Sequence, residues 1–132
     1  MTMPVPGNAY ELYEKLMHTP DLCGQFYIVN AYELQWSIYK DLTVSIGIGQ
    51  RDADVVIERK IWGRIPDVLT HWHSKPSEIY GEICNIGCRG NVLVIRKNLF
   101  GETVLYAGAE TNFPYSLDKK WYWGRIYYLK AE

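Results

Sequence analysis

The fold is decided by one stretch of sequence, ELQWSIYKDLTVSIGIG, which covers residues 33–49. Apolar and polar residues alternate twice in it, on either side of the pair Lys40-Asp41. A period of two is typical of a β-strand, because every second side chain points to the same face of the sheet. The short connection at Lys40-Asp41 is a turn and cannot hold a parallel crossover, so the two strands are predicted to be antiparallel neighbours. The residues predicted to face the core are Leu34, Trp36, Ile38, Val44 and Ile46.

The same pattern extends to both sides of this stretch. Phe26–Val29 precedes it as a short apolar run, and Val55–Ile57 follows it and leads into Lys60-Ile61-Trp62. The sequence therefore predicts four strands between Gln25 and Ile65.

Two segments change to a helical period. Asn8–Met17 begins with a residue that caps helices and continues with an apolar stripe, and Pro20 follows its end. Ser77–Ile86 carries a second apolar stripe and ends at Gly87. Both are predicted to be helices.

The last third of the chain returns to strands. Val92–Lys97 and Thr103–Ala107 flank turn residues at Asn98–Gly101 and predict a hairpin, and Trp121–Leu129 predicts the final strand. The predicted fold is α+β: a curved, mostly antiparallel sheet of five to seven strands with two helices packed on one face, in the order αββββαβββ. Whether this sheet is open or closed into a barrel does not follow from the sequence.

Length and composition indicate the general class of protein. A chain of 132 residues predicts a single domain, with residues 1–7 as a short N-terminal arm. The first residues lack the basic and apolar regions of a signal peptide, and the sequence has no apolar run of about 18 residues, so we expect neither export nor a membrane span. Three cysteines, an odd number, are expected to be free thiols in a reducing cytoplasm.

Aromatic content is the unusual feature of the composition. Five Trp, eleven Tyr and three Phe make up 14% of the chain, while the formal net charge is −1. Tyr and Trp combine a large apolar body with one polar atom, which suits a half-buried sheet face or an interface. The near-zero charge argues against nucleic acid as the partner.

His71, His73 and Glu78 are candidate metal ligands. In an extended strand His71 and His73 lie on the same side, where two neutral imidazoles can chelate a divalent ion. The spacing His71-x-His73, four residues, Glu78 resembles the first metal-binding motif of the cupin family, in which two His and one Glu on barrel strands hold a metal. The resemblance covers about ten residues, and no histidine follows His73 to supply the family's third. The alternative is two histidines bonded to nearby carboxylates or backbone, so we predict no metal and no other cofactor.

The terminal strand is the candidate binding surface. Its predicted face carries Trp121, Trp123, Arg125 and Tyr127, with basic residues between aromatic ones. Such a face fits a protein interface, where Trp, Tyr and Arg supply most of the binding energy. It also fits single-stranded nucleic acid, which stacks on aromatic rings beside positive charge.

Other motifs give weaker signals. Cys84 and Cys88 lie near the end of the second predicted helix, where the dipole disfavours a thiolate, and Cys84 is expected to be buried and unreactive. The glycines of Gly47–Gly49 and Gly87–Gly90 do not precede a helix, as a phosphate-binding loop requires. The absence of a catalytic motif disfavours an enzyme without excluding one.

The function predicted from these observations is a small, non-catalytic, cytoplasmic domain that binds a protein, with a second copy of the chain among the possible partners. By analogy of size and type alone, it is comparable to bacterial immunity, anti-restriction and mobile-element accessory proteins. Two alternatives remain: a small metal-dependent or ligand-pocket enzyme that uses His71 and His73, and a single-stranded nucleic-acid binder that uses the terminal strand.

Overall fold

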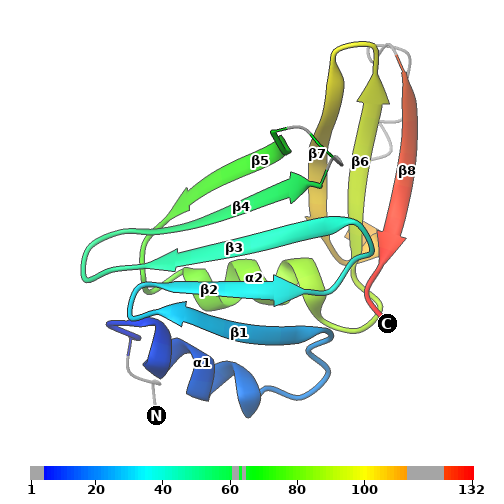
Figure 1. Cartoon of the computed structure of the whole chain (residues 1–132). Helices are drawn as coiled ribbons and strands as arrows, with labels where there is room; N and C mark the ends of the chain where they lie inside the picture. Colours follow the sequence, from blue (N-terminus) through cyan, green and yellow to red (C-terminus); the bar gives the residue numbers. More distant parts are fainter. Residues whose placement is uncertain (1–4, 61–62, 64, 113–123) are drawn as a thin grey trace.

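A computed structural model describes residues 5–60, 63, 65–112 and 124–132 of the chain (Figure 1). The elements, in chain order, are α1 (Ala9–Met17), β1 (Gln25–Asn30), β2 (Glu33–Ser37), β3 (Leu42–Ile48), β4 (Ala53–Arg59), β5 (Asp67–Ser74), α2 (Ile79–Gly87), β6 (Val92–Asn98), β7 (Gly101–Gly108), a short 3-10 helix (Glu110–Asn112) and β8 (Arg125–Lys130). The α+β class, the antiparallel pairing and both predicted helices are confirmed.

The strands form two open sheets. A five-stranded sheet has the order β1-β2-β3-β4-β5, and a three-stranded sheet has the order β7-β6-β8. All neighbouring strands are antiparallel. The sequence pattern predicts one sheet and does not decide whether it closes. The structure separates them into two sheets and closes neither into a barrel.

The predicted order αββββαβββ misses one strand, β5. Its sequence, DVLTHWHS, does not alternate cleanly, because the apolar residues Val68 and Leu69 are adjacent and only Leu69 is buried. The pairing of β5 with β4 shifts register between Ile57 and Glu58, which breaks the period of two at this point.

The core lies on one face of the five-stranded sheet. Leu34, Val44 and Ile46 are fully buried there and Trp36 is 1% exposed, as the alternation predicts. Ile38 is half-buried and packs against them. Directly paired residues share a face, so the pairs Leu34–Ile46 and Trp36–Val44 continue this apolar surface from β2 to β3.

Both helices contribute to the same core. The Asn8 side chain caps α1 by accepting a hydrogen bond from the Glu11 amide at 2.9 Å, and Leu12 and Leu16 are buried beneath it. Helix α2 begins two residues later than predicted and lies behind the five-stranded sheet in Figure 1. None of the described helices is long and apolar enough to cross a membrane.

Several aromatic side chains bury their rings and pair their polar atoms. Trp36 Nε1 donates to the Cys23 carbonyl at 3.0 Å, and the buried Tyr39 hydroxyl donates to the Ile86 carbonyl at 2.6 Å. Gly87 is needed at the end of α2 because a Cβ there would lie 2.2 Å from the Trp36 ring. Part of the high aromatic content is therefore structural.

Candidate functional site

The predicted terminal-strand surface is described in part. Trp121 and Trp123 lie outside the described residues. Arg125 and Tyr127 belong to β8 and share a face, since they pair with Lys97 and Ile95 of β6. Arg125 is exposed and Tyr127 is half-buried, while Tyr128, on the other face, is 47% exposed.

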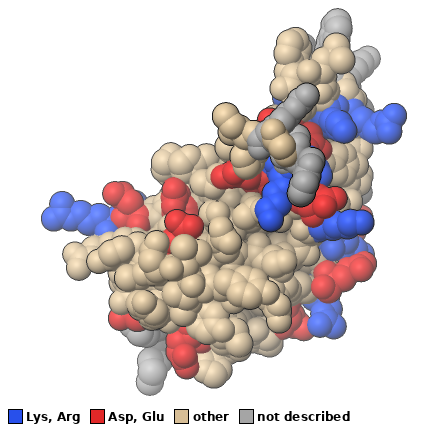
Figure 2. Space-filling view, viewed as in Figure 1, with Lys and Arg blue, Asp and Glu red and all other residues tan. Residues whose placement is uncertain are grey.

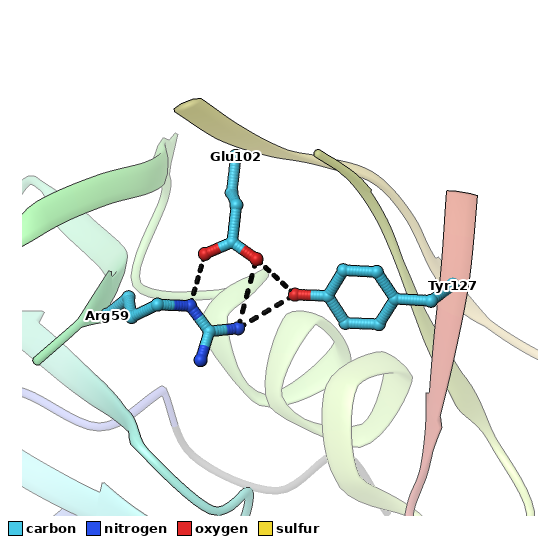
Figure 3. A network of polar contacts seen from close by, with 3 residues as sticks. All are labelled: Arg59, Glu102 and Tyr127. Carbon is cyan, nitrogen blue, oxygen red and sulfur yellow. Dashed lines mark hydrogen bonds and ion pairs between the residues drawn. The ribbon is translucent and has the colours of Figure 1, made fainter. Parts of the chain in front are cut away.

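Tyr127 belongs to a polar cluster that joins the two sheets (Figure 3). Arg59 of β4 binds the Glu102 carboxylate of β7 through Nε and Nη2, and Nη2 also donates to the Tyr127 hydroxyl at 2.7 Å. The Tyr127 hydroxyl donates to Glu102 Oε1. The Glu102 side chain is 6% exposed and that of Arg59 27% exposed. The described hydrogen-bond partners of these three side chains are one another, which indicates a structural role.

The pKa values in this cluster follow from its geometry. Burial disfavours the charged form of Glu102, but hydrogen bonds from Arg59 and Tyr127 outweigh it and lower the pKa of Glu102. Burial, then the hydrogen bond to Glu102, raises the pKa of Tyr127 to about 12. Burial opposes the charge on Arg59, but the bonds to Glu102 outweigh it and raise its pKa. The cluster is therefore a neutral tyrosine and a charged pair at neutral pH.

His71 and His73 lie together on β5, as predicted for an extended strand. Their ring centroids are 4.3 Å apart, and His71 Nε2 lies 2.8 Å from Asp54 Oδ2 on β4. Both histidines are exposed, and Glu78 follows β5 at the start of α2. Among the described residues, no group of three His, Cys, Asp or Glu side chains is placed to hold a metal ion. His71 is instead hydrogen-bonded to a carboxylate, that of Asp54, which is the arrangement expected from the sequence as the alternative to a metal site.

The cysteines are free thiols. Cys23 is buried, but Cys84 is half-buried, so the prediction of a buried Cys84 is wrong. The apolar face of α2 buries Ile79, Ile83 and Ile86, and Cys84 lies at the border of that face. Burial, together with the neighbouring Cys84, raises the pKa of Cys88 to about 11. A thiol with a raised pKa is a poor nucleophile at neutral pH.

An exposed apolar surface was missed in the sequence. Leu99 and Phe100 form the turn between β6 and β7 and are 96% and 97% exposed. They line a depression of about 520 Å3 together with Lys97, Asn98, Gly124 and Arg125. We call Lys97, Leu99, Phe100 and Arg125 the tip. In Figure 1 this turn is the far end of the three-stranded sheet, away from both helices.

A signal for the tip was present in the sequence. Asn98-Leu99-Phe100-Gly101 was recognised as a turn, yet its two central residues are large and apolar, where turns usually carry polar ones. The comparisons with known proteins add nothing to this site: no protein-family model, no curated protein and no solved structure matches the chain.

Proposed function

We propose that this protein is a small, non-catalytic, cytoplasmic domain that binds another protein, and that the partner contacts the tip. The observation that carries the proposal is the exposure of Leu99 and Phe100, at 96% and 97%. Exposed apolar residues that lie together usually mark an interaction site. Arg125, from the surface predicted in the sequence, belongs to the tip.

Folding does not require apolar residues in this turn. The turn is stabilised by Asn98, whose side chain accepts a hydrogen bond from the Phe100 amide at 2.8 Å, and by Gly101, whose φ is 127°. The two central positions accept most residue types. Burying a Leu or Phe side chain contributes about 1.5–3 kcal/mol, a gain that Leu99 and Phe100 do not obtain within the described fold. A partner with an apolar pocket would bury both side chains and provide this free energy.

The charges around the turn specify the partner further. Lys97 and Arg125 are directly paired on β6 and β8, and both are exposed. In the view of Figure 2, most blue side chains lie over the three-stranded sheet, with red side chains among them. A protein pocket with acidic residues on its rim complements apolar residues flanked by basic ones, and such rim charges speed up association.

The polar clusters favour binding over catalysis. Glu102 is bonded to Arg59 and Tyr127, and His71 is bonded to Asp54. Catalytic acids and bases must instead reach a substrate from an accessible cavity. Three free cysteines suit a reducing cytoplasm, which supports the proposed location.

The test is capture of the partner from an extract of the native host, followed by reconstitution from purified proteins. The bait is the wild-type chain, the double variant Leu99→Ser/Phe100→Ser, or the control Tyr10→Ser, which changes a 55% exposed aromatic residue on α1. We expect the double variant to bind the purified partner about 30- to 1,000-fold more weakly, which corresponds to the roughly 2–4 kcal/mol of a central apolar contact. The control should bind normally.

Two results would refute the proposal. One is equal affinity of the wild type and the double variant for the purified partner. The other is an extract in which the wild-type chain retains no protein above an empty matrix, or retains nucleic acid instead.

A further inference from the structure

A second candidate binding surface lies at β1, one of the two edge strands of the five-stranded sheet. This strand pairs with β2 on one side, and no described strand pairs with its other side. Five of its six residues are exposed, and Phe26 is the exception. A strand edge of this kind presents a row of backbone N–H and C=O groups to any extended chain that approaches it.

The sequence of β1 does not protect this edge. QFYIVN contains no charged residue and no proline, although Tyr27, Ile28 and Val29 are 53%, 39% and 49% exposed. Edge strands in natural proteins usually carry charges or prolines that prevent pairing with another chain. Another edge strand, β8, begins with Arg125 and ends with Lys130. Because β1 lacks such residues, its edge is open to pairing with another chain.

A groove accompanies the open edge. It has a volume of about 400 Å3 and lies between the second half of α1 and the start of β1. Its apolar lining consists of Tyr13, Leu16, Met17, Leu22, Phe26 and Tyr27. The rest of the lining is polar but uncharged. We call it the β1 groove. In Figure 1, α1 runs along β1 at this edge of the five-stranded sheet.

We propose that the β1 groove binds an extended peptide segment of a partner protein, which adds to β1 as a further strand of the sheet. Backbone hydrogen bonds to β1 hold the segment, and every second side chain points into the groove between Met17 and Phe26. Since the lining is uncharged, the segment that fits has apolar residues at alternate positions and no charge among them. This site is independent of the tip.

The geometry favours a peptide over a second copy of the chain. A six-residue strand is about 20 Å long, and an edge with its groove about 10 Å wide offers roughly 200 Å2, far below the roughly 800 Å2 per partner of a stable dimer. In Figure 1, α1 runs along β1. If a second copy paired through its own β1, its α1 would also have to fit beside this edge. A single extended segment meets neither obstacle.

The experiment uses a displayed library of random eight-residue peptides and the full chain. Selected peptides are synthesised, and their affinity is measured by fluorescence anisotropy. We expect alternating apolar residues in the selected sequences. N-methylation of every second amide, in each of the two registers, should lower affinity at least tenfold in one register and much less in the other, because only one set of amides faces β1.

Variants of the protein locate the binding site. Met17→Glu places a charge in the groove at a 58% exposed position, and Tyr27→Lys places one on the edge strand; each should weaken binding at least tenfold. Tyr128→Lys, at a similarly exposed position on β8, and the tip variant Leu99→Ser/Phe100→Ser should bind the peptide as the wild type does. Thermal melts establish that each variant is folded.

Hydrogen exchange supplies the direct readout. The outward-facing amides of β1 should exchange rapidly in the free protein and at least tenfold more slowly with a saturating peptide. The proposal is overturned if the library yields no binder, if N-methylation has no effect in either register, or if Met17→Glu and Tyr27→Lys both bind normally. None of these results bears on the tip, whose partner is measured separately.

Discussion

The two sheets differ in what holds them in place. The five-stranded sheet is fixed by apolar alternation, and its inward residues on β2, β3 and β4 are 0–7% exposed. The three-stranded sheet has an apolar centre in β6, but its contact with the other sheet also includes the cluster of Arg59, Glu102 and Tyr127. It also carries Leu99 and Phe100, the most exposed of the large apolar side chains described. The central strands of the first sheet are held by buried apolar residues, whereas the second sheet combines a polar attachment with a surface that folding does not require.

The largest effect is expected in the five-stranded sheet. Trp36→Ala removes a ring that is 1% exposed, stacks on Phe26 at 4.7 Å and donates to the Cys23 carbonyl. We expect the free energy of unfolding to fall by about 3–5 kcal/mol, measured by urea denaturation. Trp72→Ala, at a half-buried position on β5, should cost clearly less. If both substitutions lowered the free energy of unfolding equally, Trp36 would contribute no more to the core of this sheet than the peripheral Trp72.

A smaller effect is expected at the polar attachment. Glu102→Gln leaves Arg59 without its charged partner, and we expect a loss of about 1–3 kcal/mol at pH 7. Because folding lowers the pKa of Glu102, its contribution is fully present above the ordinary value of about 4.3 and is lost as the pH falls through the lowered value.

The pH dependence tests this attachment separately. The difference in unfolding free energy between wild type and Glu102→Gln should shrink as the pH is lowered from 6 toward 2. A difference that is constant over this range would show that the Glu102 charge does not stabilise the contact between the sheets. Thr103→Val, at an exposed neighbouring position of β7, is the matched control and should show no such trend.

The smallest effects are expected at the exposed apolar residues. Leu99→Ser/Phe100→Ser and Tyr27→Lys should each change the free energy of unfolding by no more than about 0.5 kcal/mol, because they lose little buried surface. Thermal and urea denaturation measure this change. A loss above about 1.5 kcal/mol at the turn would mean that Leu99 and Phe100 are covered within the chain in solution.

The sequence predicted the parts of the fold that depend on local periodicity. Leu34, Trp36, Val44 and Ile46 alternate cleanly, and all are buried. The strand β5 was missed because a register shift disrupts its pattern. The division into two sheets depends on contacts between residues far apart in the chain, such as Arg59 with Glu102, which no local pattern reveals.

The candidate site was predicted less completely than the fold. Arg125 was placed on a binding surface and is exposed, whereas Tyr127 has its hydroxyl bonded to Glu102. The half-burial of Tyr127 depends on how β8 pairs with β6, and this pairing is not encoded within β8. The turn at Leu99 and Phe100 was identified, but its lack of cover is a property of the folded surface.

Photocrosslinking in the native host tests the central claim most directly. A photoreactive phenylalanine analogue replaces Phe100 in the tip or, as the control, Tyr10 on α1, and the cells are irradiated. The account predicts one predominant protein adduct from position 100, suppressed by Arg125→Glu, and no such adduct from position 10. The absence of a protein adduct from position 100, or the same adducts from both positions, would contradict it.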